Sequence, residues 1–114
     1  MDSLWQQAQH LLALPTLQRY FDARHYRAAS NELPYVTAQG EVRRIDRVVE
    51  FDDEVWVLDY KTGERVTADD LAACAAPYRK QVREYCAALR EIYRGKPVRG
   101  ALVFGNGLLY EVAN

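Results

Sequence analysis

Apolar residues recur at helical spacing over residues 2–22, which predicts helix in this segment. Pro15 is expected to divide the segment into two helices, because a proline inside a helix removes a hydrogen bond and costs about 3 kcal/mol. Three large side chains of the second helix are expected to turn inward: Leu17, Tyr20 and Phe21.

After a connector at 22–30, the pattern changes to short runs rich in β-branched and aromatic residues. Three such runs are bounded by turn residues and predict strands at 31–40, 41–51 and 54–61. Pro34 lies in the first run, which suits an edge strand or the start of a strand.

Helical spacing returns over 71–95, where Pro77 either kinks the helix or begins its main segment. Its expected core stripe is Tyr78, Tyr85, Leu89 and Ile92. Two further strands are predicted within 97–112, joined by a Gly-Asn-Gly turn suited to positive φ. The order α-α-β-β-β-α-β-β predicts an α/β fold in which helices flank a mixed central sheet.

Composition bounds the classes of protein that this chain can represent. Its 114 residues support a single domain, 1–114. A net charge of −1 argues against a nucleic-acid binder that relies on basic charge, but not against an enzyme that meets phosphate through a metal. Cys74 and Cys86 lie in one helical pattern and fit neither zinc pairs nor a disulfide framework. No membrane-spanning run or signal peptide is found, so we expect a cytoplasmic location without membrane contact.

The stretch VVEFDDEVWVLDYKTG, residues 48–63, reads as a hairpin with acids in unexpected places. If the turn is centred on Asp52-Asp53, paired residue numbers sum to 105, and Asp46 lies opposite Asp59. Lys61 then points to the same face as Asp59, because side chains alternate along a strand. The opposite face is expected to be core and carries Ile45, Val49, Phe51, Trp56, Leu58 and Tyr60.

Opposed carboxylates destabilise a sheet unless a cation lies between them. Magnesium suits such oxygen ligands, and a nearby lysine can orient water or offset phosphate charge. Two alternatives remain open from the residues alone. Asp-Asp is not a favoured two-residue turn, and an odd loop length would turn Asp46 and Asp59 to opposite faces. The acids would then belong to an ordinary solvated hairpin of an unrelated α/β domain.

The segments RIDRVVEF, EVWVLDYKTG and YRKQVREYCAAL together resemble the C-terminal nuclease domain of UvrD-type helicase–nucleases of the RecB and AddA kind. That domain belongs to the PD-(D/E)XK superfamily, and the resemblance runs from about Glu32 to the C-terminus. It implies a restriction-endonuclease-like core that forms the C-terminal part of a longer helicase–nuclease.

The resemblance also implies roles for the hairpin residues. Asp46, Asp59 and the main-chain carbonyl of Tyr60 would bind Mg²⁺ or Mn²⁺, and Lys61 would orient the attacking water and stabilise the transition state. Glu32 would support the metal or the lysine.

On the following helix, Gln81 and Tyr85 would contact DNA near the scissile phosphate or brace the metal ligands. Arg47 would approach phosphate or pair with an acid such as Glu54. The implied reaction is hydrolysis of DNA phosphodiesters, on single strands or duplex ends, in repair or recombination beside helicase motor domains.

One feature of the related nucleases has no clear match. They usually carry an upstream histidine that serves as a further metal ligand, and neither His10 nor His25 lies in a convincing copy of that motif. The chain reads as beginning just past that histidine. A second hypothesis is therefore a weakly active or inactive nuclease fold that guides DNA or docks a protein.

Overall fold

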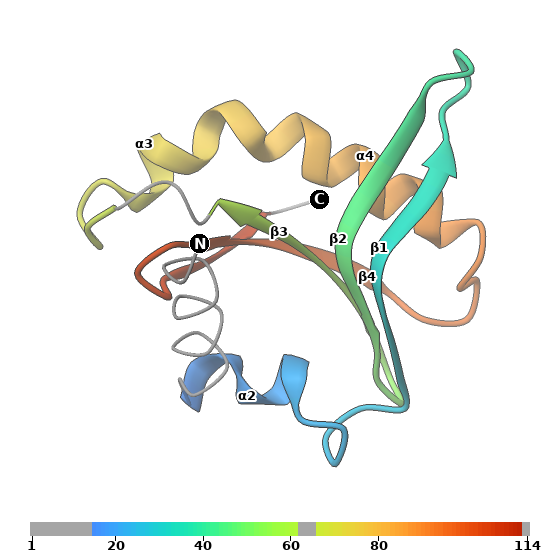
Figure 1. The fold of residues 1–114 in the computed structure, drawn as a ribbon, viewed down its shortest axis with the longest axis horizontal. Coiled ribbons are helices and arrows are strands. Elements are labelled where there is room, and N and C mark those ends of the chain that lie inside the picture. The colour runs from blue at the N-terminus through green and yellow to red at the C-terminus, as the bar shows by residue number, and fades with distance from the viewer. Residues whose placement is uncertain (1–14, 62–65, 113–114) are drawn as a thin grey trace, which may run out of the picture.

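The computed structural model describes residues 15–61 and 66–112, so the predicted helix before Pro15 lies outside the described residues. Within these ranges, five strands form one sheet in the order β1-β2-β3-β4-β5. The pair β3–β4 is parallel and the other neighbours are antiparallel. This mixed sheet with flanking helices confirms the predicted α/β class, and Figure 1 shows the arrangement.

The elements follow the predicted order from Pro15 onward. They are α2 (Pro15–Phe21), β1 (Ala28–Val36), β2 (Val42–Glu50), β3 (Val55–Lys61), α3 (Leu71–Ala75), the 3₁₀ turn η1 (Ala76–Tyr78), α4 (Arg79–Arg90), β4 (Val98–Phe104) and β5 (Leu109–Val112). No helix among the described residues is long and apolar enough to cross a membrane.

Three element boundaries differ from prediction by several residues, and one of them is the end of β1, at Val36 instead of residue 40. Strand β1 begins at Ala28, inside the expected connector, because Ala28 and its neighbours pair with the far end of β2. Helix α4 ends at Arg90 and not at Gly95, so Ile92 leaves the predicted core stripe and is 67% exposed.

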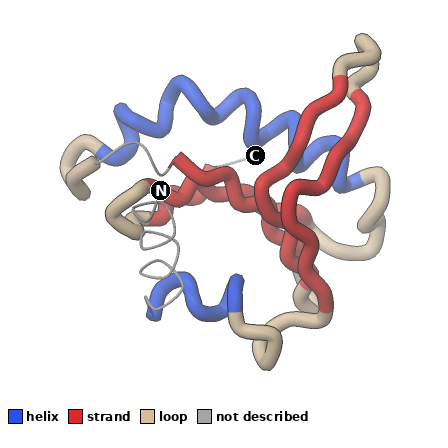
Figure 2. The backbone as a smooth tube through the Cα atoms, viewed as in Figure 1, coloured by secondary structure: helices blue, strands red, loops and turns tan. Residues whose placement is uncertain are grey.

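Helices cover both faces of the sheet, as Figure 2 shows. One apolar cluster joins the sheet to α3 and α4, and it includes Val55 and Val57 of β3. The other joins the sheet to α2 and includes Trp56 and Leu58. Successive residues of β3 therefore alternate between two cores, as a strand buried on both faces requires.

Close packing brings α4 onto the sheet. A Cβ atom on Gly100 of β4 would lie 2.3 Å from Val82 Cγ1 and 2.9 Å from Cys86 Sγ. Both distances are far below van der Waals contact, so only glycine lets the helix approach this closely. The approach fixes the distance between α4 and β4.

The hairpin of β1 and β2 extends past the rest of the sheet and crosses α4 in the view of Figure 1. The ladder from β2 to β3 ends at Arg47, whereas that from β2 to β1 continues to Val42. Beyond this split Ile45 packs in the cluster under α4, so its predicted place on the face of Val49 is wrong. The reason is that the freed part of β2 turns away from β3 and toward the helix.

Candidate active site

The hairpin of β2 and β3 has the predicted register. A two-residue loop connects the strands, and the Phe51 amide donates to the Glu54 carbonyl at 2.8 Å. The paired residues run from Glu50 with Val55 to Arg47 with Leu58, so their numbers sum to 105. This register excludes the slipped one, and Asp46 and Asp59 are the residues that follow the last ladder pair on the two strands.

Asp46 occupies the point where the ladder stops. Its Oδ2 accepts a hydrogen bond from the Tyr60 main-chain amide at 2.8 Å. The carboxylate thus takes the place that a strand carbonyl would hold in a continued ladder. This contact fixes Asp46 against β3, on the side of its neighbour Asp59.

Asp59 is a buried carboxyl group, with only 5% of the residue exposed. Its Oδ2 has no hydrogen-bond partner among the described residues, although Lys61 Nζ lies 3.4 Å away. Burial, and then a hydrogen bond with Asp46, raise the pKa of Asp59 to about 6, against the opposing effect of Lys61. Asp59 therefore favours its protonated form when no cation is bound.

Lys61 points to the same side as Asp59, as the alternation along β3 predicts. Its ammonium also lies over the ring of Tyr78, with Nζ 4.4 Å from the ring centroid. Sequence reasoning assigned Tyr78 to the helix core and missed this contact. The break at Pro77 was the available signal, because a change of helical phase there moves every later side chain.

Tyr85 of α4 is buried behind the acids. Burial and then the charge of Asp59 raise its pKa to about 12, so it remains a neutral phenol. Its ring packs edge-on against Tyr35 of β1, with centroids 5.8 Å apart. Gln81 lies one turn earlier on the same helix and is half-buried. Of these two residues, Tyr85 is the one whose pKa the neighbouring acids influence.

Arg47 lies away from the acids, because adjacent residues of a strand point to opposite faces. It is 6% exposed, and its guanidinium donates to the Tyr20 carbonyl at 2.9 Å and to Asn31 Oδ1 at 2.7 Å. A third, longer bond reaches the Tyr26 hydroxyl at 3.3 Å, and Phe21 lies under the guanidinium. The structure gives Arg47 the position of a brace between α2 and the sheet.

Glu32 of β1 does not point toward Asp46 and Asp59. The register of β1 and β2 would put it opposite Asp46. However, its φ of 51° lies in the left-handed region, and its side chain is 74% exposed, 4.0 Å from Arg44. Within the described residues, no three His, Cys, Asp or Glu side chains gather as a metal-binding group.

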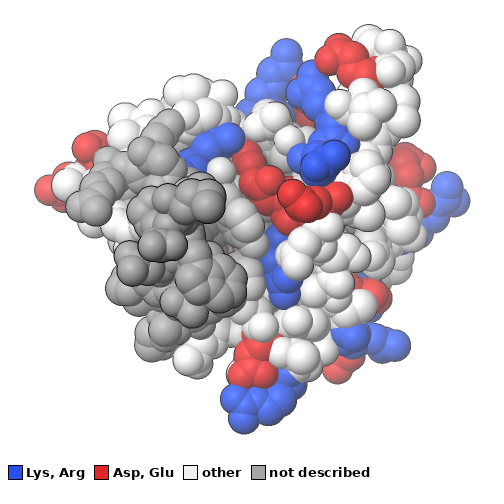
Figure 3. Space-filling view, in the orientation of Figure 1, with Lys and Arg blue, Asp and Glu red and all other residues white. Residues whose placement is uncertain are grey.

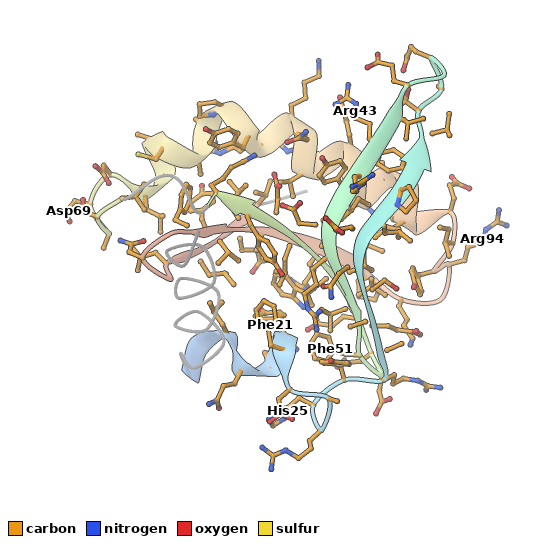
Figure 4. All side chains as sticks on the ribbon, viewed as in Figure 1. Phe21, His25, Arg43, Phe51, Asp69 and Arg94 are labelled. Atoms are coloured by element: carbon orange, nitrogen blue, oxygen red, sulfur yellow. The ribbon has the colours of Figure 1, made fainter. Side chains whose placement is uncertain are left out.

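His25 also lies apart from the acids. Figure 4 shows it in the loop after α2, on the side of the sheet opposite α4. His10 lies outside the described residues. The described part of the site thus consists of Asp46, Asp59, Lys61 and the helix residues above them.

The carboxylate oxygens of Asp46 and Asp59 are suitable ligands for Mg²⁺. Magnesium typically takes one or two carboxylates and keeps several waters, and this site offers two adjacent carboxyl groups. One of their oxygens is buried without a hydrogen-bond partner among the described residues, as expected of an atom reserved for a ligand. Figure 3 shows acidic side chains gathered near the middle of the molecule, with basic ones beside them.

Two carboxylates and a lysine suit metal-dependent hydrolysis of a phosphodiester, because the acids can hold the cation and the lysine can offset phosphate charge. In agreement, the family model of the PD-(D/E)XK nuclease superfamily matches residues 2–110. The chain therefore belongs to the PD-(D/E)XK nuclease superfamily. The residue types of Asp59, Tyr60 and Lys61 match the letters (D/E)XK of that name, whereas Ile45 and not a proline precedes Asp46. No curated protein matches the sequence.

Proposed function

We propose that this chain is a Mg²⁺- or Mn²⁺-dependent DNA nuclease domain that hydrolyses phosphodiester bonds. We further propose that it works with helicase motor domains, as in nucleases of the RecB and AddA kind, in DNA repair or recombination. The observation that carries the proposal is the convergence of three groups. Asp46 and Asp59 are adjacent where the ladder ends, and Lys61 Nζ lies 3.4 Å from Asp59 Oδ2.

Asp46, Asp59 and the main-chain carbonyl of Tyr60 would hold the divalent cation. When bound, the cation would supply Lewis-acid polarisation of the phosphate and a lower pKa for a coordinated water. The Tyr60 amide keeps Asp46 in place by its 2.8 Å hydrogen bond. Since Tyr60 directs its ring into the cluster on the α2 side, only its main chain faces this site.

Lys61 would act on the reacting groups directly. Its ammonium carries three donors and no acceptor, so it can donate to a water and to a phosphate oxygen together. A fixed positive charge beside the phosphate stabilises the negative charge that develops in the transition state. The side chain is 21% exposed, which leaves part of it accessible to a substrate.

The helix residues would serve two different purposes. Tyr85 is buried, so its role is to brace the acids and not to touch DNA. Gln81 is half-buried, and its amide can reach toward a bound strand. A net charge of −1 gives little long-range attraction for DNA, which supports delivery of the strand by a partner motor.

Cleavage assays test the proposal on linear single-stranded and duplex DNA with Mg²⁺ or Mn²⁺. Removing a preorganised donor of this kind typically lowers the rate by about 10²–10³-fold, and we expect such a loss in Lys61→Ala. Lys80→Ala is the matched control, because Lys80 is an exposed lysine on α4. Equal activity of the wild type and Lys61→Ala would refute the role of Lys61.

A second candidate is a nuclease fold that guides DNA or docks a protein without cutting. It is favoured by the positions of Glu32 and His25, neither of which lies at the acids. Calorimetric titration separates the two candidates. Binding of Mn²⁺ in the wild type that is lost in Asp59→Asn supports the nuclease, whereas no binding at millimolar metal supports the docking module.

A further inference from the structure

The ammonium of Lys61 is held from two sides. Asp59 Oδ2 lies 3.4 Å from Nζ, and the centroid of the Tyr78 ring lies 4.4 Å from the same atom. An aromatic face attracts a cation within about 6 Å of its centroid, and more strongly where water is partly excluded. Lys61 is mostly buried, so both contacts act in such an environment.

Only one of these two contacts is independent of the acidic pair. Asp59 is a neighbour of Asp46 and would be a ligand of any cation bound there. A cation at Asp59 competes with the lysine for the same carboxylate and repels its ammonium. The ring of Tyr78 is neutral, so its attraction for Lys61 does not depend on which ion the acids hold.

The backbone explains how Tyr78 reaches this position. Pro77 lies in the first turn of η1 and has no amide hydrogen to continue the hydrogen-bond series of α3. The chain therefore forms a 3₁₀ turn between α3 and α4, and Tyr78 is its last residue. This turn shifts the helical phase, and the Tyr78 ring meets Lys61 while also packing on the cluster under α4.

We propose that Tyr78 is a positioning residue that fixes the Lys61 ammonium beside Asp46 and Asp59 through its aromatic ring. The proposal rests on the proposed function, in which Lys61 acts on the phosphate. It adds that the lysine is oriented from the helix as well as from its own strand. The hydroxyl group of Tyr78 is not required, because the contact is made by the ring.

The contact can be measured without activity. The chain has three lysines, Lys61, Lys80 and Lys96, so lysine labelled with ¹³C at the ε position gives three resolvable NMR signals. Loss of one signal in Lys61→Arg assigns it. Protons over the face of a ring are shifted upfield, so the Lys61 signal should lie upfield in the wild type and in Tyr78→Phe. In Tyr78→Leu it should return to the ordinary lysine position.

Activity provides the second measurement. In Tyr78→Leu we expect kcat to fall between about 2-fold and about 30-fold, the range expected from loss of one cation–π contact, with KM little changed. Tyr78→Phe should restore the rate. Tyr93→Leu is the matched control, because Tyr93 also packs half-buried on the same cluster and, within the described residues, no lysine or arginine lies over its ring.

Two results would overturn the proposal. One is an unchanged Lys61 signal in Tyr78→Leu, and the other is a lost upfield shift with an unchanged cleavage rate. The Lys96 signal reports correct folding, since Lys96 binds Glu50 and the Phe51 carbonyl in a different part of the protein. If the wild type cuts no DNA, the proposed function fails, while the Lys61 signal still decides whether the ring holds the lysine.

Discussion

Replacing Asp59 by asparagine is predicted to stabilise the metal-free protein at neutral pH. Asp59 is 5% exposed, and the pKa of its carboxyl group is raised from 3.8 to about 6 by burial and by Asp46. A group whose ionised form is disfavoured in the folded state weakens folding whenever it must ionise. Asparagine keeps nearly the same shape and removes that ionisation.

The magnitude and sign of the change in stability follow from the pKa of Asp59 in the unfolded chain, 3.8, and in the folded protein, about 6. The shift of about two units corresponds to about 3 kcal/mol, and the attraction of Lys61 is already included because it lowers the raised value. Between about pH 4 and pH 6 the folded chain keeps a proton that the unfolded chain has lost. The free energy of unfolding therefore falls as pH rises through this window, by up to about 3 kcal/mol.

Urea unfolding in EDTA, at several pH values from about 4 to 7.5, measures this difference. Asp59→Asn should match the wild type at the acid end and exceed it by up to about 3 kcal/mol at neutral pH. Asp52→Asn is the control, since it removes a carboxylate that is 87% exposed in the turn of the same hairpin. A difference that does not change with pH, or an Asp59→Asn variant less stable at neutral pH, would refute the reasoning.

Two further predictions concern residues that the resemblance placed at the site. Arg47→Ala should lower the free energy of unfolding by about 3 kcal/mol, because it leaves the Tyr20 carbonyl and Asn31 Oδ1 without their donor. A loss below about 1 kcal/mol in urea unfolding would contradict its role as a brace. Glu32→Gly should raise the free energy of unfolding by about 1 kcal/mol, because glycine adopts positive φ without strain. Glu32→Gln keeps the strain and should show no such gain, and calorimetry should find unchanged Mn²⁺ affinity in both variants.

The geometry of the β2–β3 hairpin could be predicted because it depends on short-range rules. A two-residue loop fixes the sum of paired residue numbers, and alternation then fixes the faces of Asp59 and Lys61. These rules hold wherever the ladder is continuous. They failed at Ile45, which lies just beyond the last ladder pair, where the strand is free to turn toward α4.

The surroundings of Arg47 and Lys61 could not be predicted in the same way. The acceptors of Arg47 lie 27 and 16 residues away in the chain, on α2 and β1. No local pattern indicates that a charged residue in a strand will find such distant partners. The ring over Lys61 depends on the helical phase after Pro77, which a periodic pattern drawn through the whole helix cannot supply.

The split of the sheet explains why the site forms where it does. In a continuous ladder the Tyr60 amide would bond to a carbonyl of β2, and opposed acids would remain a destabilising pair. Here β2 leaves β3 after Arg47, and the amide that loses its ladder partner is satisfied by the carboxylate of Asp46. The same divergence leaves Asp59 Oδ2 buried without a hydrogen-bond partner among the described residues. A buried carboxylate oxygen without a hydrogen bond is stabilised by a bound cation. The departure of β2 from β3 therefore orients Asp46 and leaves Asp59 with an oxygen that can bind a cation.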